Sequence, residues 1–192
     1  MESLVVSFAT VAVAELGDRT QLIALVLAMR FRRPWPILAG MLLATLAANA
    51  VVGAVGRSFG VLLTPAAVDG VVGLGLVAMG IWALKADAHH GAIAAKSRGA
   101  FVATLVTFFV AELGDKTQIA TAALAAGYPN LLAVVGGATA GLMVVNLPVV
   151  FLGKAFEKRL PIRAIHAGAA VLFGALGVLF LARAVGHFAG SP

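Results

Sequence analysis

Six long apolar runs dominate the sequence, and they restrict the chain to one kind of fold. The runs cover roughly residues 4–29, 35–56, 66–84, 100–126, 130–153 and 164–185. Each is close to the roughly 20 residues that a helix needs to cross a bilayer. Only 11% of the residues are charged, whereas a soluble domain carries about 25%. The sequence therefore predicts an all-α integral membrane protein, with six transmembrane helices in a single domain over residues 1–192.

A nine-residue stretch occurs twice within these runs. Residues 13–21 read VAELGDRTQ and residues 110–118 read VAELGDKTQ, near the middle of the first and fourth runs. Each copy carries a glutamate and an aspartate at a depth where an aspartate costs about 2.5–3.5 kcal/mol to insert. Buried ion pairs stabilise a fold only weakly, which argues against a purely structural role for the motif. We therefore interpret both copies as parts of a functional site.

The two motifs belong to an internal repeat with an offset of 97 residues, which also pairs Asn49 with Asn146. Each half holds three predicted helices, an odd number, so the second half must cross the membrane in the opposite direction to the first. We predict two inverted three-helix repeats, residues 1–86 and residues 100–192, joined by a cytoplasmic linker at residues 87–99. Many secondary transporters have inverted repeats with a binding site near the bilayer midplane.

Basic residues between the runs predict the orientation of the chain, because cytoplasmic segments are enriched in Lys and Arg. Ten of them follow the first, third and fifth runs: Arg30, Arg32, Arg33, Lys85, Lys96, Arg98, Lys154, Lys158, Arg159 and Arg163. Only Arg57 and Arg183 lie on the opposite side. Both termini are therefore expected outside the cytoplasm. The Ala-, Val- and Gly-rich composition suggests a bacterial plasma membrane.

The four motif acids, Glu15, Asp18, Glu112 and Asp115, are the candidate metal ligands. On a continuous helix, the acids of each motif are three residues apart and share a face. If the repeats bring the two motifs together, four carboxylates meet near the midplane. Like charges this close cannot all stay ionised, so they bind cations or share protons. Both outcomes at one site predict a cation/proton exchanger.

Oxygen ligands favour hard cations such as Mn²⁺, Ca²⁺ or Mg²⁺. Neither motif contains Cys, Met or His, so copper and zinc are less favoured. Neutral oxygens for the same site are assigned to supporting residues, which are Thr20, Gln21, Asn49, Thr117, Gln118 and Asn146. The two asparagines fit hydrogen bonds between helices equally well.

Arg19 and Lys116 are the two basic residues that lie inside the runs. Each follows its motif glutamate by four positions, and an unpaired cation inside the membrane is costly. We interpret them as internal counter-ions that lessen the repulsion between the acids in the metal-free site.

Glycines mark two further features of the runs. Gly17 and Gly114 separate the acids of each motif, and they allow either local unwinding of the helix or close approach of a neighbour. Gly137 and Gly141 form a GxxxG pattern, which predicts a helix-packing face.

The twin Glu-x-Gly-Asp-(Lys/Arg)-Thr pattern, at residues 15–20 and 112–117, resembles the hallmark of a family of cation/proton exchangers. That family includes the Golgi manganese and calcium transporter of eukaryotes and manganese exporters of bacteria. The resemblance covers essentially the whole chain, and Arg19 in place of the commoner Lys is a mild departure. It implies export of Mn²⁺, and also of Ca²⁺, from the cytosol in exchange for protons, with the four motif acids as ligands.

Other function classes fit less well. An exporter of amino acids or small solutes would need asymmetric recognition groups, whereas these two half-sites are nearly identical. Di-metal carboxylate enzymes place a His three residues after a Glu, and neither motif does, so no enzyme activity and no cofactor are expected. A passive channel stays open, as do a homo-oligomer and metal binding by His89 and His90. The expected partners are divalent cations, protons and lipid, and not nucleic acid.

The basic-residue bias gives a prediction of topology. A reporter fused after Pro192 should be active only when it requires an extracytoplasmic location. Activity confined to a cytoplasmic reporter at the same position would reverse the predicted orientation.

Overall fold

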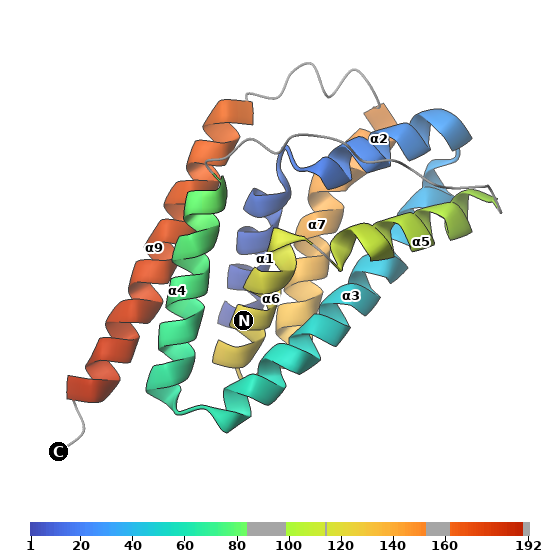
Figure 1. The fold of residues 1–192 in the computed structure, drawn as a ribbon. Helices are drawn as coiled ribbons and strands as arrows, with labels where there is room; N and C mark the ends of the chain where they lie inside the picture. The colour runs from blue at the N-terminus through green and yellow to red at the C-terminus, as the bar shows by residue number, and fades with distance from the viewer. Residues whose placement is uncertain (84–98, 114, 153–161, 190–192) are drawn as a thin grey trace.

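A computed structural model describes residues 1–83, 99–113, 115–152 and 162–189 (Figure 1). Within these ranges the chain forms eight helices and no strand. The helices are α1 (Glu2–Glu15), α2 (Arg19–Phe31), α3 (Pro34–Leu62), α4 (Pro65–Ala83), α5 (Gly99–Glu112), α6 (Lys116–Gly127), α7 (Leu131–Leu152) and α9 (Ile162–Ala189). The all-α prediction is therefore confirmed for this part of the chain. His89, His90 and nearly all of the predicted linker lie outside it.

The first and fourth apolar runs are not continuous helices, so the sequence prediction is wrong at these two places. The first run is divided into α1 and α2, and the fourth is divided into α5 and α6. Both divisions fall inside the repeated motif, between its glutamate and its aspartate. The argument that Glu15 and Asp18 share one helical face therefore fails, because they lie on either side of a break.

A β-turn explains the first break. The N–H of Asp18 donates to the carbonyl of Glu15 at 3.2 Å. Between them Leu16 has φ −64° and ψ 117°, and Gly17 has φ 78°. These are the angles of a type II turn, which needs a positive φ at its third residue and so favours glycine there. Of the two roles left open for Gly17, unwinding of the helix is confirmed.

Three of the described helical segments are long and apolar enough to cross a membrane, namely Pro34–Leu62, Leu131–Leu152 and Ala170–His187. The shorter apolar helices include Thr20–Phe31, Pro65–Ala78 and Gly99–Glu112. The breaks shorten the first and fourth runs below the length of a single spanning helix.

Two pairs of helices lie at opposite edges of the molecule, and further helices pack between them. In Figure 1, α4 and α9 run side by side along one edge, while α2 and α5 extend toward the opposite edge. Between them, α1 packs against α7, and α6 packs against α3 and α4. The contact of α1 with α7 has a counterpart in the contact of α5 with α3, since α5 and α3 occupy the corresponding places in the other half.

Glycine contacts follow the 97-residue offset closely. A Cβ on Gly40 would meet the carbonyl oxygen of Phe101 at 2.6 Å. The equivalent Gly137 packs against the carbonyl of Leu4, and Leu4 is the residue equivalent to Phe101. Exchanging the halves therefore exchanges the two contacts. Gly141 packs in the same way, since a Cβ added there would lie 2.6 Å from the carbonyl oxygen of Phe8. The predicted GxxxG packing face is therefore confirmed.

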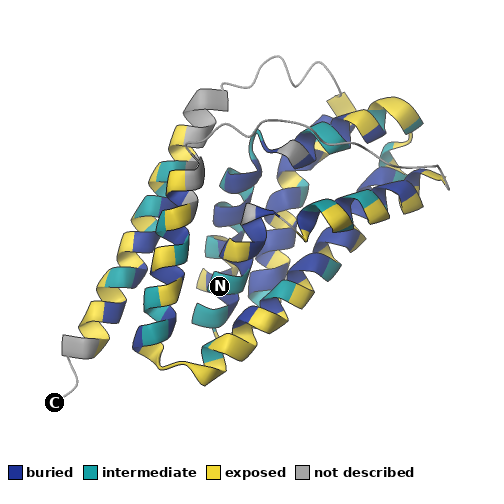
Figure 2. Cartoon of the chain, in the orientation of Figure 1, coloured by how far each residue is buried: buried dark blue, intermediate teal, exposed yellow. Residues whose placement is uncertain are grey.

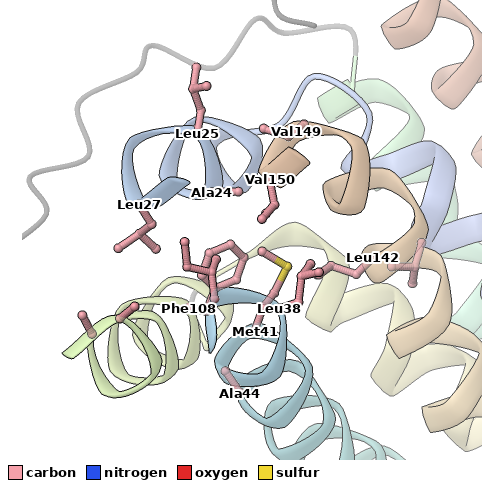
Figure 3. Close-up of a cluster of buried hydrophobic side chains, with 14 of the residues drawn as sticks. Ala24, Leu25, Leu27, Leu38, Met41, Ala44, Phe108, Leu142, Val149 and Val150 are labelled. Atoms are coloured by element: carbon pink, nitrogen blue, oxygen red, sulfur yellow. The ribbon is translucent and has the colours of Figure 1, made fainter. Parts of the chain in front are cut away.

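Buried apolar side chains join helices of both repeats. The largest cluster takes residues from α1, α2, α3, α5 and α7, with Leu27, Met41, Phe108 and Leu142 almost fully buried (Figure 3). Exposed residues follow the outer faces of α3, α4 and α9 (Figure 2), and many are large and apolar, such as Leu43, Leu74 and Val178. A surface of this kind suits contact with lipid rather than water.

The glycine face gives a test of the packing. Gly137→Ala should destabilise the fold by about 1–3 kcal/mol, because the added methyl overpacks the contact with α1. The neighbouring Gly136→Ala is a matched control, since its Cβ would meet nothing within 4 Å. Thermal unfolding of the purified variants in detergent measures both effects. Equal melting temperatures for the two variants would contradict the close approach of α1 and α7.

Candidate metal centre

Three carboxylates converge where the helix breaks meet. One oxygen each from Glu15, Asp18 and Asp115 lies within 4.8 Å of the other two. All three side chains are buried, with exposed fractions of 0%, 1% and 6%. The structure therefore brings acids from both motifs into one site, as the repeat predicted.

The ends of four helices position these acids. Glu15 and Glu112 are the last residues of α1 and α5. Asp18 and Asp115 are the N-caps of α2 and α6, and their side chains accept from the N–H groups of the threonines two positions later. An N-cap carboxylate is stabilised by the positive end of the helix dipole. The break thus gives each buried aspartate a backbone N–H donor that a continuous helix would use internally.

The fourth acid, Glu112, is fully buried but lies outside the group of three. Its Oε2 accepts from the Nε2 of Gln118 at 3.2 Å. The group of three therefore contains three of the four predicted ligands, and Glu112 is buried nearby, where Gln118 donates to its carboxylate. The role of each of the four acids as a ligand stays a prediction.

Hydroxyl groups from both motifs bond to the acids. Thr20 Oγ1 donates to Glu15 Oε2 at 2.6 Å, and Thr117 Oγ1 donates to Asp115 Oδ2 at 2.9 Å. Both threonines thus lie in the site, as predicted. They act on it through its carboxylates.

The four supporting amides are buried, and they contact different groups. Asn49 accepts from Gln118 and donates to Thr139 Oγ1, each at 3.2 Å. Gln21 accepts from the N–H of Gly17 at 2.8 Å. Asn49 therefore makes the hydrogen bonds between helices that were one of its two predicted roles.

Asn146, the fourth amide, donates to the carbonyl of Leu142 one turn earlier in α7, at 3.1 Å. Its Oδ1 is buried and has no hydrogen-bond partner among the described residues. It therefore differs from Asn49, although the repeat makes the two residues equivalent.

Sequence reasoning missed a set of buried hydroxyls on α1 and α3. Ser7, Thr10 and Thr45 are fully buried, and their hydroxyl oxygens have no partner within the described part of the chain. The same is true of Glu15 Oε1. A buried polar group without a partner costs about 1–3 kcal/mol, so this interior suits water or a cation. Isolated Ser and Thr residues in apolar runs were the signal in the sequence.

The chemistry of the centre follows from its donor set. Carboxylate oxygens, with hydroxyl and amide groups around them, provide the oxygen-only environment that hard divalent cations prefer. Three carboxylates carry a formal charge of −3 if all are ionised, which a divalent ion offsets in large part. The side chains of Arg19 and Lys116 lie outside the described residues, so their counter-ion role stays a prediction.

Comparison with known proteins points to one family. The profile described as "Divalent cation/proton antiporter GDT1" matches residues 3–91 and 100–187. A protein of Vibrio cholerae serotype O1 named "Putative manganese exporter" is 42% identical over 174 residues, which is 90% of this chain and 87% of the relative. "GDT1-like protein sll0615" of Synechocystis sp. is 32% identical over 184 residues, with 85% and 88% covered. No solved structure matches the chain.

The site geometry predicts unequal effects on cation binding. Glu15→Gln should weaken the affinity for Mn²⁺ at least about tenfold, because it removes a charged ligand from the group of three. Glu2→Gln is the control, since Glu2 is an exposed carboxylate far along α1 from the break. Titration calorimetry of the purified proteins measures both. Unchanged affinity in Glu15→Gln would exclude Glu15 as a ligand.

Proposed function

The chain belongs to the GDT1 family of divalent cation/proton antiporters, and we propose that it exports Mn²⁺ from the cytosol in exchange for protons. The relative from Vibrio cholerae, named as a manganese exporter, supports Mn²⁺ as the cargo. Ca²⁺ is a second candidate cargo, because it prefers the same oxygen ligands. The proposed location is a bacterial plasma membrane.

The convergence of Glu15, Asp18 and Asp115 is the observation that carries this proposal. Each acid is buried, and each comes from one of the two motifs that distinguish the chain. Burial removes the competition of bulk water for the cation, and ionised carboxylates replace its hydration shell. The neighbouring hydroxyls and amides hold the carboxylates in place.

Proton coupling follows from the same acids. A divalent ion needs ionised ligands, so its binding displaces protons from the carboxylates. When the ion leaves, the acids repel one another and take up protons again. A site that can hold either the ion or protons, but not both, links the flow of one to the opposite flow of the other.

We further propose six membrane spans arranged as two inverted repeats, with α1 and α2 forming one interrupted span and α5 and α6 another. The exchanged contacts of Gly40 and Gly137 support a two-fold relation between the halves. Arg183 lies near the end of α9, and its Nη2 is 3.9 Å from Oε1 of Glu2. The two ends of the described chain thus lie at the same end of the molecule, as an even number of spans requires.

Flux into proteoliposomes tests the exchange directly. An imposed pH gradient should drive Mn²⁺ uphill, and Glu15→Gln should abolish this flux while leaving the protein folded. A panel of divalent ions then orders the cargo preference. Flux that only dissipates a Mn²⁺ gradient would indicate a channel, and amino-acid flux without Mn²⁺ flux would favour the solute exporter.

Direct competition also predicts a pH dependence. The affinity for Mn²⁺ should fall as the pH is lowered from about 8 to about 5.5, because protonated carboxylates are poor ligands. Calorimetry in buffers of different ionisation enthalpy should detect protons released on binding. An affinity that stays constant over this range, without proton release, would rule out direct competition at the site.

A further inference from the structure

Equivalent threonines of the two repeats bond to different acids. Thr20 donates to Glu15, the glutamate of its motif, at 2.6 Å. The equivalent Thr117 donates instead to Asp115, the aspartate of its motif, at 2.9 Å. The two copies of the motif have nearly the same sequence, so this difference does not come from the motif residues themselves.

The equivalent glutamines differ as well. Gln118 Nε2 lies 3.2 Å from Glu112 Oε2 and 3.2 Å from Asn49 Oδ1, so it links the glutamate of its motif to α3. Gln21, its counterpart, donates to the carbonyl of Val145 at 3.5 Å and does not contact its own motif glutamate in the described structure. Glu15 thus accepts from the threonine of its motif, whereas Glu112 accepts from the glutamine of its motif.

The two glutamates also differ in whether they belong to the group of three carboxylates. Glu15, bonded by a threonine, belongs to the group of three carboxylates. Glu112, bonded by the amide of Gln118, lies outside that group. We call the first arrangement threonine-held and the second amide-held.

We propose that the repeats exchange these arrangements when the carrier changes sides, so that Glu15 and Glu112 take turns as the third carboxylate of the cation site. Asn49 and Asn146 are the positioning residues that receive the glutamine of whichever repeat is amide-held. The inference rests on the proposed antiport, and it adds an assignment of the residues that distinguish the two states.

The unpartnered oxygen of Asn146 supports this exchange. In the amide-held second repeat, Asn49 Oδ1 accepts from Gln118. The equivalent acceptor for Gln21 is Asn146 Oδ1, which is buried and has no partner among the described residues. Gln21 Nε2 already contacts the carbonyl of the adjacent Val145, at 3.5 Å, the long end of the hydrogen-bond range.

Thr139 makes the two states unequal. It accepts from Asn49 Nδ2 at 3.2 Å and so fixes the orientation of that amide. The offset places Leu42 at the equivalent position for Asn146, and Leu42 has no acceptor. Asn146 donates to the carbonyl of Leu142 instead. The additional support at Asn49 explains why the amide-held repeat is the second one in this structure.

Cysteine labelling can test the exchange, because the chain contains no native cysteine. Met29→Cys and Ala126→Cys form a matched pair, since the offset makes the two positions equivalent near the ends of α2 and α6. Ala126 lines a cavity of about 400 Å³ at its end of the molecule, and Met29 is 39% exposed. The ratio of their maleimide labelling rates, in nanodiscs without Mn²⁺, reports the balance between the two states.

Asn49→Ala and Asn146→Ala should shift this labelling ratio in opposite directions, each by about fivefold, the population change expected from losing one hydrogen bond. The double variant should return the ratio toward that of the parent protein. Shifts in the same direction, or no shift, would overturn the exchange, because a merely structural role gives no reason for opposite signs.

Two controls keep the result interpretable. If either alanine variant fails to fold, Asn49→Ser and Asn146→Ser retain a small polar side chain and carry the same expected signs. Mn²⁺ exchange by the two cysteine variants is measured separately in proteoliposomes. A lack of exchange there contradicts the proposed function, whereas the labelling ratio, taken without Mn²⁺, decides the exchange of hydrogen bonds alone.

Discussion

The type II turn between Glu15 and Asp18 is the constraint on which the site depends. A continuous helix would bury two carboxylates with no backbone donors near them, since every N–H would be used within the helix. The turn ends α1 and starts α2, so Asp18 becomes an N-cap and its charge faces free N–H groups. Gly17 permits this at φ 78°, a conformation that is costly for other residues. The site therefore exists because the helix is broken.

One interrupted helix would not suffice for a divalent ion. A single motif supplies two acids, and the site has three because Asp115 joins Glu15 and Asp18 across the repeat. Close backbone contacts fix the halves relative to one another, with Gly40 and Gly137 in exchanged positions. A packed contact between backbones has little room to deform, so each pair of packed helices behaves as a rigid unit. The side-chain hydrogen bonds at the centre can rearrange without disturbing these pairs.

The all-α fold could be predicted from the sequence, because the length of the apolar runs reports directly on helices that suit a membrane. The convergence of acids from the two motifs could also be anticipated, since nine residues recur almost unchanged. The break was missed because long apolar runs were treated as uninterrupted helices. The sequence did carry a signal for the break. Gly17 is suited to a turn, and Asp18, which follows it, is a good N-cap residue. Hydropathy alone does not register it.

The asymmetry between the motifs could not be predicted from the motifs themselves, because both copies offer the same threonine and glutamine to the same acids. Two equal half-sites share one divalent ion. If their glutamates compete for one remaining ligand position, only one glutamate can coordinate the ion at a time. Such a pair lowers its free energy by adopting one unequal arrangement. The exchanged arrangement then differs in free energy only by the contacts that do not repeat, such as the bond from Asn49 to Thr139. The threonine-held Glu15 and the amide-held Glu112 are one such arrangement. A carrier needs two states of similar free energy, because it must pass from one to the other in both directions.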